Sequence, residues 1–148
     1  MVIFIKKFLK VFVPLIICIV VSSIFVFVGL NNFKSLNKPM FSPPSFVFSI
    51  VWSIIYLIFY FTMKNNNDSK TYILYIITLI LHVIWNLTFF TLHFYIIALI
   101  VLLIIYIEGF VFVYNISKNN KKIYYIYLIY IIWLLIALYL NFGIVLLN

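Results

Sequence analysis

Aromatic side chains recur every fourth residue between positions 45 and 60, and they are the first candidates for contact with a ligand. With this spacing Phe48, Trp52 and Tyr56 fall on one side of a helix. Their rings could stack on a flat, apolar molecule, or they could pack against neighbouring helices as in many membrane bundles. A narrow stripe of small residues runs beside them: Ser45, Ser49 and Ser53.

Two other stretches each place aromatic and polar side chains on one helical face. Together with Trp52, these two faces could line one cavity, in which rings stack on a flat ligand and a few polar groups orient it. The alternative is ordinary bundle packing, with His82 and Asn141 hydrogen-bonded across helices. The first face comprises Thr78, His82, Trp85 and Phe89, and the second comprises Tyr130, Trp133, Ala137 and Asn141.

Two titratable side chains stand out because the sequence around them is apolar. His82 could ligate a haem iron through its imidazole, although a lone histidine in a membrane span more often makes an interhelical hydrogen bond. Glu108 lies deep in an apolar stretch and has no basic partner at matching depth, which makes it a functional candidate. Alternatively, its protonated carboxyl pairs with a neighbouring helix or across a dimer. No metal site is expected, because the two histidines, Asp68 and Glu108 lack the spacing of metal ligands.

The composition defines the environment in which these residues are placed. The chain has 148 residues, of which 68% are hydrophobic and only 8% are charged, so we expect an all-α integral membrane protein in contact with the lipid bilayer. The net charge of +8 does not indicate nucleic-acid binding, because the lysines are scattered between apolar stretches. The single cysteine, Cys18, allows no internal disulfide, and no phosphate-binding glycine loop occurs.

Five transmembrane helices in a single domain, residues 1–148, account for the apolar stretches. The uncharged run 71–107 is too long for one ordinary span, and we expect it to break near residues 91–94. The first apolar run resembles a signal peptide but is too long for one, so we expect it to be retained. The expected spans are 11–30, 43–63, 71–91, 95–115 and 123–147.

A basic loop with several prolines precedes the second span and should define where that helix starts. Ser42 is expected to cap the free backbone amides, and Pro43 suits the first helical turn because its missing donor costs nothing there. The dipeptide Lys38-Pro39 should keep the approach to the helix extended.

The distribution of lysines predicts the orientation of the five spans. One side of the membrane would carry only Lys34 and Lys38, and the cytoplasmic side is expected to be richer in lysine. The amino terminus is therefore expected in the cytoplasm, and the carboxyl terminus and the first loop outside. The lysines of the cytoplasmic side are Lys6, Lys7, Lys10, Lys64, Lys70, Lys118, Lys121 and Lys122.

Three blocks of residues carry a resemblance to a known family. The first is Leu36-Asn37-Lys38-Pro39 with Phe41, Pro43-Pro44, Val47-Phe48, Trp52 and Tyr56; the second is 81–86 with Phe89-Phe90; the third is Tyr130, Trp133, Ala137 and Leu140-Asn141. In these blocks the chain resembles the translocator protein family (TspO/MBR), also called tryptophan-rich sensory proteins or peripheral-type benzodiazepine receptors. Asn148 corresponds to the asparagine that often closes bacterial members, and a bacterial cell membrane is the expected location.

The resemblance implies a five-helix bundle, often a homodimer, with a cavity beneath the first loop. In that family the cavity binds tetrapyrroles, sterols and synthetic isoquinoline or benzodiazepine-type ligands. No cofactor is required, but a porphyrin or haem could be bound. The resemblance places ligand contacts at Lys38, Pro39, Phe41, Pro43, Pro44, Phe48, Trp52, Tyr56, His82, Trp85, Phe89, Tyr130, Trp133, Ala137 and Asn141.

The chain departs from the family pattern at several positions. Phe41 and Phe46 stand where tryptophan is common, His82 where asparagine is usual, and Ile129 where a proline usually precedes Tyr130. After Asn141 there is no lysine or arginine, so the weak cholesterol-binding pattern is absent from this end.

The resemblance favours a membrane protein that binds porphyrin-like or other hydrophobic ligands, in sensing, transport or tetrapyrrole homeostasis. One alternative is light-dependent porphyrin breakdown, because Trp52 and Trp133 fall at the positions implicated in that activity in the family; the porphyrin itself would supply the photochemistry. A second alternative is a small transporter that uses Glu108. The third is a structural subunit of a larger membrane complex.

Overall fold

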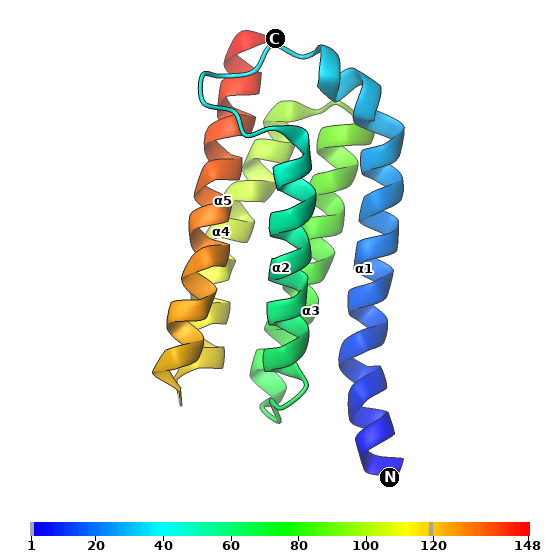
Figure 1. Ribbon diagram of the computed structural model, residues 1–148, viewed down its shortest axis with the longest axis vertical. Helices are drawn as coiled ribbons and strands as arrows, with labels where there is room; N and C mark the ends of the chain where they lie inside the picture. Colours follow the sequence, from blue (N-terminus) through cyan, green and yellow to red (C-terminus); the bar gives the residue numbers. More distant parts are fainter. Residues whose placement is uncertain (1, 119) are drawn as a thin grey trace.

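The computed structural model describes residues 2–118 and 120–148, and it describes side chains from Phe8 onward. The chain is 86% helical, without strands in the described part. Figure 1 shows a bundle of long helices whose two termini lie at opposite ends. In order, the helices are α1 (Val2–Ser35), α2 (Ser45–Met63), α3 (Ser69–Asn86), the π-helical η1 (Leu87–Thr91), α4 (Tyr95–Ser117) and α5 (Lys121–Leu147).

Five segments of these helices are long and apolar enough to cross a membrane, as the sequence predicts. The helix α3 runs into η1 and ends at Thr91, and α4 begins at Tyr95, so the interruption in the long apolar run lies at residues 92–94. Large apolar side chains cover the outside of the bundle. Because a bilayer is the only surrounding that solvates such a surface, the chain is an integral membrane protein.

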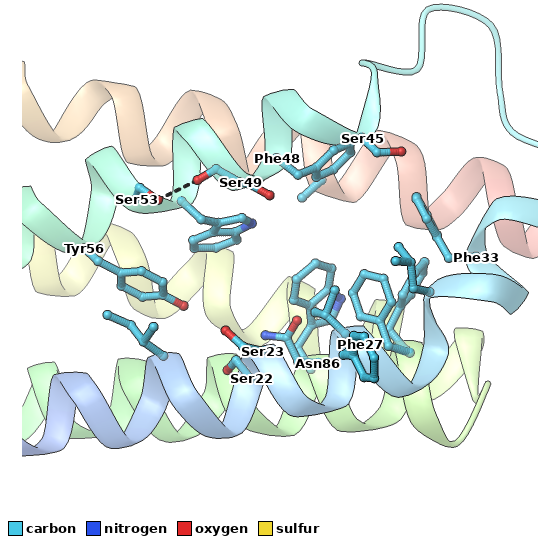
Figure 2. Close-up of a pocket in the computed structure, with 18 of the residues that line it drawn as sticks. Ser22, Ser23, Phe27, Phe33, Ser45, Phe48, Ser49, Ser53, Tyr56 and Asn86 are labelled. Carbon is cyan, nitrogen blue, oxygen red and sulfur yellow. Dashed lines mark hydrogen bonds between the residues drawn. The ribbon is translucent and has the colours of Figure 1, made fainter.

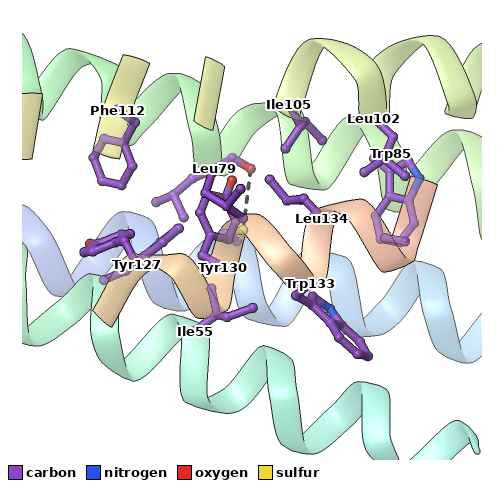
Figure 3. Packing of buried hydrophobic residues seen from close by; sticks show 14 of the residues in the cluster. Ile55, Leu79, Trp85, Leu102, Ile105, Phe112, Tyr127, Tyr130, Trp133 and Leu134 are labelled. Carbon is purple, nitrogen blue, oxygen red and sulfur yellow. Dashed lines mark hydrogen bonds between the residues drawn. The ribbon is translucent and has the colours of Figure 1, made fainter. Parts of the chain in front are cut away.

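The helix α4 packs closely against both α3 and α5. A cluster of fully buried rings, among them Phe112, Tyr127 and Tyr130 (Figure 3), joins them to α2 through Phe59. Its ring centroid is 5.7 Å from that of Tyr127, 5.2 Å from that of Tyr130 and 5.5 Å from that of Phe112. Aromatic pairs at such distances stabilise a core beyond the area they bury. This cluster therefore fixes α2 against α5.

The start of α2 differs from the prediction. The helix begins at Ser45, its N-cap is Pro44, and no side chain caps it. The hydroxyl of Ser42 donates to the Pro39 carbonyl at 2.7 Å, so the prediction that Ser42 caps the helix was wrong. The reason is Pro44, because a proline disfavours helical dihedral angles in the residue before it and so keeps Pro43 out of the helix.

The helix α1 continues to Ser35, beyond the predicted start of the first loop at residue 31. The ammonium of Lys38 donates to the carbonyls of Lys34 and Leu36, at 3.3 and 3.4 Å. A cation at this position satisfies carbonyls that have no partner inside the helix and complements the negative end of the helix dipole. The loop that connects α1 to α2 is therefore shorter than the sequence suggested.

The polar turn before α3 ends in a side-chain cap that the sequence analysis did not predict. Asp68 is the N-cap of α3, and its carboxylate accepts hydrogen bonds from the hydroxyl of Thr71 at 2.6 Å and from the Thr71 amide at 2.9 Å. These two hydrogen bonds hold the pKa of the Asp68 carboxyl below its ordinary value, the hydroxyl being the stronger cause.

Close backbone approach fixes α1 against η1 at Gly29. A Cβ atom at this position would overlap the backbone carbonyl of Phe90. Glycine is thus required where α1 crosses η1. By contrast, α1 and α2 make few direct contacts with each other.

Candidate ligand-binding cavity

A cavity of about 1100 Å³ lies between α1 and α2, with α3, η1 and α5 also contributing to its wall (Figure 2). Its lining is predominantly apolar, with a small number of hydroxyl and amide groups, which is the usual character of a small-molecule site. The aromatic side chains that line it are Phe12, Phe27, Phe33, Phe46, Phe48, Trp52, Tyr56, Tyr60, Phe61, Trp85, Phe89 and Phe90.

The helical spacing of α2 explains its contribution. Phe48, Trp52 and Tyr56 all line the cavity, because residues four apart lie one above the other on a helix. The rings of Trp52 and Tyr56 are stacked, with centroids 5.8 Å apart and planes inclined by 29°. Ser49 and Ser53 lie beside them, and the Ser53 hydroxyl donates to the Ser49 carbonyl at 2.7 Å.

The end of the cavity near the first loop is enclosed by rings from four elements, α1, α2, α3 and η1. Phe33 of α1 has its centroid 6.3 Å from that of Phe48 and 5.5 Å from that of Phe90. The centroids of Trp85 and Phe89 are 5.7 Å apart. Both Phe89 and its neighbour Phe90 line the cavity, and both belong to η1. Single π-helical turns of this kind often occur at functional sites.

A hydrogen-bonded chain holds the indole of Trp85 in the wall. Its Nε1–H donates to Oδ1 of Asn141 at 3.3 Å, and Nδ2 of Asn141 donates to the Tyr95 carbonyl at 3.0 Å. Both polar ends of the Asn141 side chain are therefore engaged within the protein. Although Asn141 lines the cavity, its geometry is that of a residue that positions Trp85.

Two lysines lie at the mouth of the cavity, and both line it. The ammonium of Lys38 lies 4.8 Å from the centroid of the Phe33 ring and caps the end of α1 as described above. An ammonium group has three donors, and two of those of Lys38 are used by backbone carbonyls. Lys34 is exposed. The mouth therefore offers cationic donors to an anionic group on a ligand.

The loop over the mouth is fastened to the end of α5. The Asn37 amide donates to Oδ1 of Asn148, and Nδ2 of Asn148 donates back to the Asn37 carbonyl, both at 3.0 Å. The hydroxyl of Tyr139 donates to the Met40 carbonyl. The Pro39 ring occupies the space above Gly143, where a side chain would collide with it. The loop is thus a docked lid whose position depends on α5.

Comparison with known proteins identifies the family of the chain that forms this cavity. The sequence model of the TspO/MBR family matches residues 11–147. The chain belongs to the TspO/MBR family. A relative described as tryptophan-rich protein TspO, from Archaeoglobus fulgidus, is 31% identical over 125 residues, which cover 78% of this chain and 79% of the relative. The resemblance recognised in the sequence is confirmed.

In this TspO/MBR-family chain, the residues predicted as ligand contacts fall into two groups by position. Only the first group lines the cavity, and the ligand-binding role of both groups stays a prediction. Those that line it are Lys38, Pro43, Phe48, Trp52, Tyr56, Trp85, Phe89, Ala137 and Asn141. Those outside the lining are Pro39, Phe41, Pro44, His82, Tyr130 and Trp133.

Packing explains why several predicted contacts lie outside the lining. His82 is buried behind Trp52, at 4.9 Å between ring centroids, and its Nε2 is 3.3 Å from the Tyr130 hydroxyl. Trp133 is buried against Phe48, at 5.3 Å between centroids. Phe41 has a positive φ of 66° and is 87% exposed, so its ring points away from the bundle.

Glu108 is partly buried and lies outside the cavity lining. The hydroxyl of Thr78 donates to its carboxylate, at 2.8 Å to Oε2 and 3.0 Å to Oε1. This contact joins α4 to α3, which corresponds to the structural alternative considered from the sequence. Within the described residues, no three histidine, cysteine or acidic side chains lie together in a way that could hold a metal ion.

The contribution of α1 to the cavity was not predicted from the sequence. That helix supplies one whole wall of the cavity, with Ile19, Ser23 and Phe27 among its residues. They recur at helical spacing, but the first span is apolar on all sides, so its sequence does not distinguish a cavity face from a lipid face. Phe33 was missed because it lies in the stretch assigned to the loop.

Proposed function

We propose that this member of the TspO/MBR family binds porphyrin-like tetrapyrroles in the cavity between α1 and α2, for sensing, transport or tetrapyrrole homeostasis. The observation that carries the proposal is an aromatic-lined cavity of about 1100 Å³ with Lys34 and Lys38 at its mouth. Rings suit the faces of a flat macrocycle, and the lysines suit carboxylates at its edge. A ligand pocket of this volume is large enough for a bulky cofactor.

Trp52 is the central stacking platform in this proposal. Its ring lies beside those of Tyr56 and Trp85, at 5.8 and 6.3 Å between centroids, and all three line the cavity. A macrocycle placed here would contact rings from both α2 and α3. Its carboxylates would extend toward the lysines under the docked loop, so that the charged edge faces water and the ring faces the bundle interior.

A cavity-filling substitution tests the proposal. Ser49 lines the cavity, whereas its neighbour Ile50 does not and is 53% exposed. In purified protein reconstituted into nanodiscs, Ser49→Trp should weaken the binding of protoporphyrin IX at least tenfold, because the new indole occupies the ligand's space. Ile50→Trp, the matched control, should bind like the parent protein. If the parent does not bind the porphyrin, or if both variants bind it equally well, the proposal is wrong.

We also propose that the amino terminus is cytoplasmic and the carboxyl terminus lies outside, so that the mouth of the cavity opens on the outer side. The lysine asymmetry supports this orientation, and the two termini lie at opposite ends of the bundle (Figure 1). A reporter that is active only in the cytoplasm should be inactive when fused after Asn148. Activity of that fusion would reverse the orientation.

Two of the other functions considered from the sequence depend wholly or partly on residues outside the cavity lining. Light-dependent porphyrin breakdown would use Trp52 and Trp133, of which only Trp52 lines the cavity. Transport would use Glu108, which is bonded to Thr78 away from the cavity lining. Binding is therefore the function that the cavity geometry supports best.

A further inference from the structure

A lysine at the end of the cavity remote from the first loop is turned back toward the membrane. Lys64 follows directly after Met63, the last residue of α2. Its ammonium lies 4.6 Å from the centroid of the Phe61 ring and 5.7 Å from that of the Tyr60 ring. A lysine at the end of a membrane span usually extends its ammonium toward water. The ammonium of Lys64 instead lies over two rings of the span itself.

The two rings under Lys64 belong to the wall of the cavity. Both Tyr60 and Phe61 line it. Tyr60 also contacts α1, because its ring centroid is 6.1 Å from that of Phe8 and 6.0 Å from that of Phe12. These rings join α1 to α2 at this end, although the two helices make few direct contacts overall. Lys64 therefore lies where the groove between the two helices ends.

The rim of this groove on α2 faces the bilayer. Leu57 and Phe61 line the cavity and are 56% and 55% exposed. Ile54 is also exposed but lies outside the lining. Because residues three, four and seven apart lie on one side of a helix, Ile54, Leu57 and Phe61 share a face. On this face the cavity meets the hydrocarbon chains of the bilayer, and an acyl chain lying along it reaches the ammonium of Lys64.

The charges at this end of the bundle complement an anionic headgroup. Figure 1 shows that the end of α2 and the starts of α3 and α5 lie at the same end as the amino terminus. The chain has two acidic residues, Asp68 and Glu108, and both carboxylates accept hydrogen bonds from threonines. Only Asp68 lies at this end. Among the residues whose side chains are described, the lysines at this end are Lys10, Lys64, Lys70, Lys118, Lys121 and Lys122.

We propose that this end of the groove binds an anionic phospholipid of the leaflet on the amino-terminal side. Its phosphate oxygens accept hydrogen bonds from the Lys64 ammonium, and one acyl chain lies along Phe61 and Leu57. The surrounding lysines favour a headgroup without a cation, such as glycerol, over choline. This site is separate from the proposed porphyrin platform, because Trp52 lies 12 helical steps, or about 18 Å, from Lys64.

The affinity for matched lipids tests the role of Lys64. Native mass spectrometry of the delipidated protein gives dissociation constants for phosphatidylglycerol and phosphatidylcholine with identical chains. The control is Lys121→Gln, which removes the same charge from the start of α5, and α5 and α1 lie on opposite sides of α2 (Figure 1). At about 0.15 M ionic strength, distant charges are largely screened. Lys64→Gln should weaken phosphatidylglycerol binding about fivefold and reduce the preference over phosphatidylcholine, whereas Lys121→Gln should bind like the parent.

The position of the acyl chain is tested with a phosphatidylglycerol that carries a photoreactive diazirine in one chain. In nanodiscs, light should cross-link this lipid to Leu57 and Phe61 in the parent protein, and the yield should fall about fivefold in Lys64→Gln. Ile104 and Phe110 of α4 are exposed and serve as the internal control. Their cross-linking should be equal in the parent and in Lys64→Gln.

Several outcomes would overturn this site without affecting the proposed porphyrin site. Equal loss of affinity in Lys64→Gln and Lys121→Gln would mean that the whole basic end attracts lipid. Unchanged cross-linking at Leu57 and Phe61 in Lys64→Gln would make the groove an ordinary lipid-facing surface. Displacement of the lipid by glycerophosphoglycerol, the headgroup without chains, would make the ligand a soluble phosphodiester. Displacement by protoporphyrin IX would place porphyrin carboxylates at Lys64.

Discussion

The docking of the first loop on α5 can be disturbed by a single methyl group. A Cβ atom at Gly143 would lie 2.5 Å from Cγ and 2.6 Å from Cβ of Pro39. Carbon atoms prefer separations of about 3.5–4.0 Å, so the rigid proline ring would have to move by roughly 1 Å. Gly143→Ala should therefore push the loop away from α5 while leaving the helix intact.

The size of the effect follows from the contacts that the displaced ring would disturb. The Asn37–Asn148 pair and the bond from Tyr139 to the Met40 carbonyl fasten the loop on either side of Pro39. Each such bond contributes about 0.5–1.5 kcal/mol, so weakening them together should cost about 2 kcal/mol, or roughly 30-fold in the opening equilibrium of the loop. Alanine also stabilises a helix by about 1 kcal/mol over glycine, but it does so equally with the loop open or closed.

Amide hydrogen exchange at Asn37 reports this equilibrium directly, because the Asn37 amide is bonded to Asn148 in the docked state. Exchange in Gly143→Ala should be roughly 30-fold faster than in the parent. The control is Gly109→Ala, whose Cβ would meet side-chain atoms of Leu134 and Tyr130 at 3.3 Å, away from the loop. Unchanged exchange in Gly143→Ala, or equal acceleration in both variants, would refute the docking argument.

Three further predictions concern charge, stacking and helix capping. Replacing Lys34 and Lys38 together by glutamine should weaken protoporphyrin binding only several-fold and reduce its salt dependence, because exposed ion pairs contribute at most about 1 kcal/mol each. The neutral dimethyl ester of the porphyrin should bind the parent and the double variant with equal affinity. If the ester lost as much affinity as the free acid, the role of the lysines would be structural. Trp52→Ala should weaken porphyrin binding more than Trp85→Phe, because the first removes a ring and the second keeps one; equal affinities for both variants would contradict the pocket. The pKa of the Asp68 carboxyl is lower in the folded than in the unfolded state. The Asp68 cap therefore stabilises the protein fully above the unfolded-state pKa of about 3.9, and this stabilisation is lost as the pH falls through the folded-state pKa. The thermal midpoint of the parent should therefore fall more between pH 5 and pH 3 than that of Asp68→Asn, which keeps a capping oxygen; parallel curves would argue against this role.

The fold was predictable because the bilayer imposes strong constraints on sequence. Long uncharged runs separated by short polar turns predict five helices, and the run 71–107 is too long for one of them. The ends of helices were less predictable. Pro43 and Lys38 were each assigned a role from local rules, but the second proline excludes Pro43 from α2, and Lys38 caps the end of α1 from outside the helix.

The candidate site was predictable only where a helix shows contrast between its faces. On α2 the spacing of Phe48, Trp52 and Tyr56 indicated a common face, and all three line the cavity. On α5 the same rule grouped Trp133 with Asn141, but Trp133 is covered by Phe48. Whether a face meets a cavity or another helix depends on tertiary packing, and no periodicity within one helix contains that information.

The contribution of α1 was hidden for a related reason. A helix that is apolar on all sides gives no hydrophobic contrast, so the wall formed by Ile19, Ser23 and Phe27 could be recognised only once α2 was placed opposite.

The location of the bound porphyrin tests the central claim most directly. A porphyrin that carries a photoreactive diazirine can be bound to the reconstituted protein, cross-linked by light and mapped by mass spectrometry. The account predicts cross-links on the facing walls of α1 and α2, at residues such as Phe27 and Trp52, which line the cavity. Cross-links confined to the lipid-facing side of α4, at exposed residues such as Ile104 and Phe110, would contradict it.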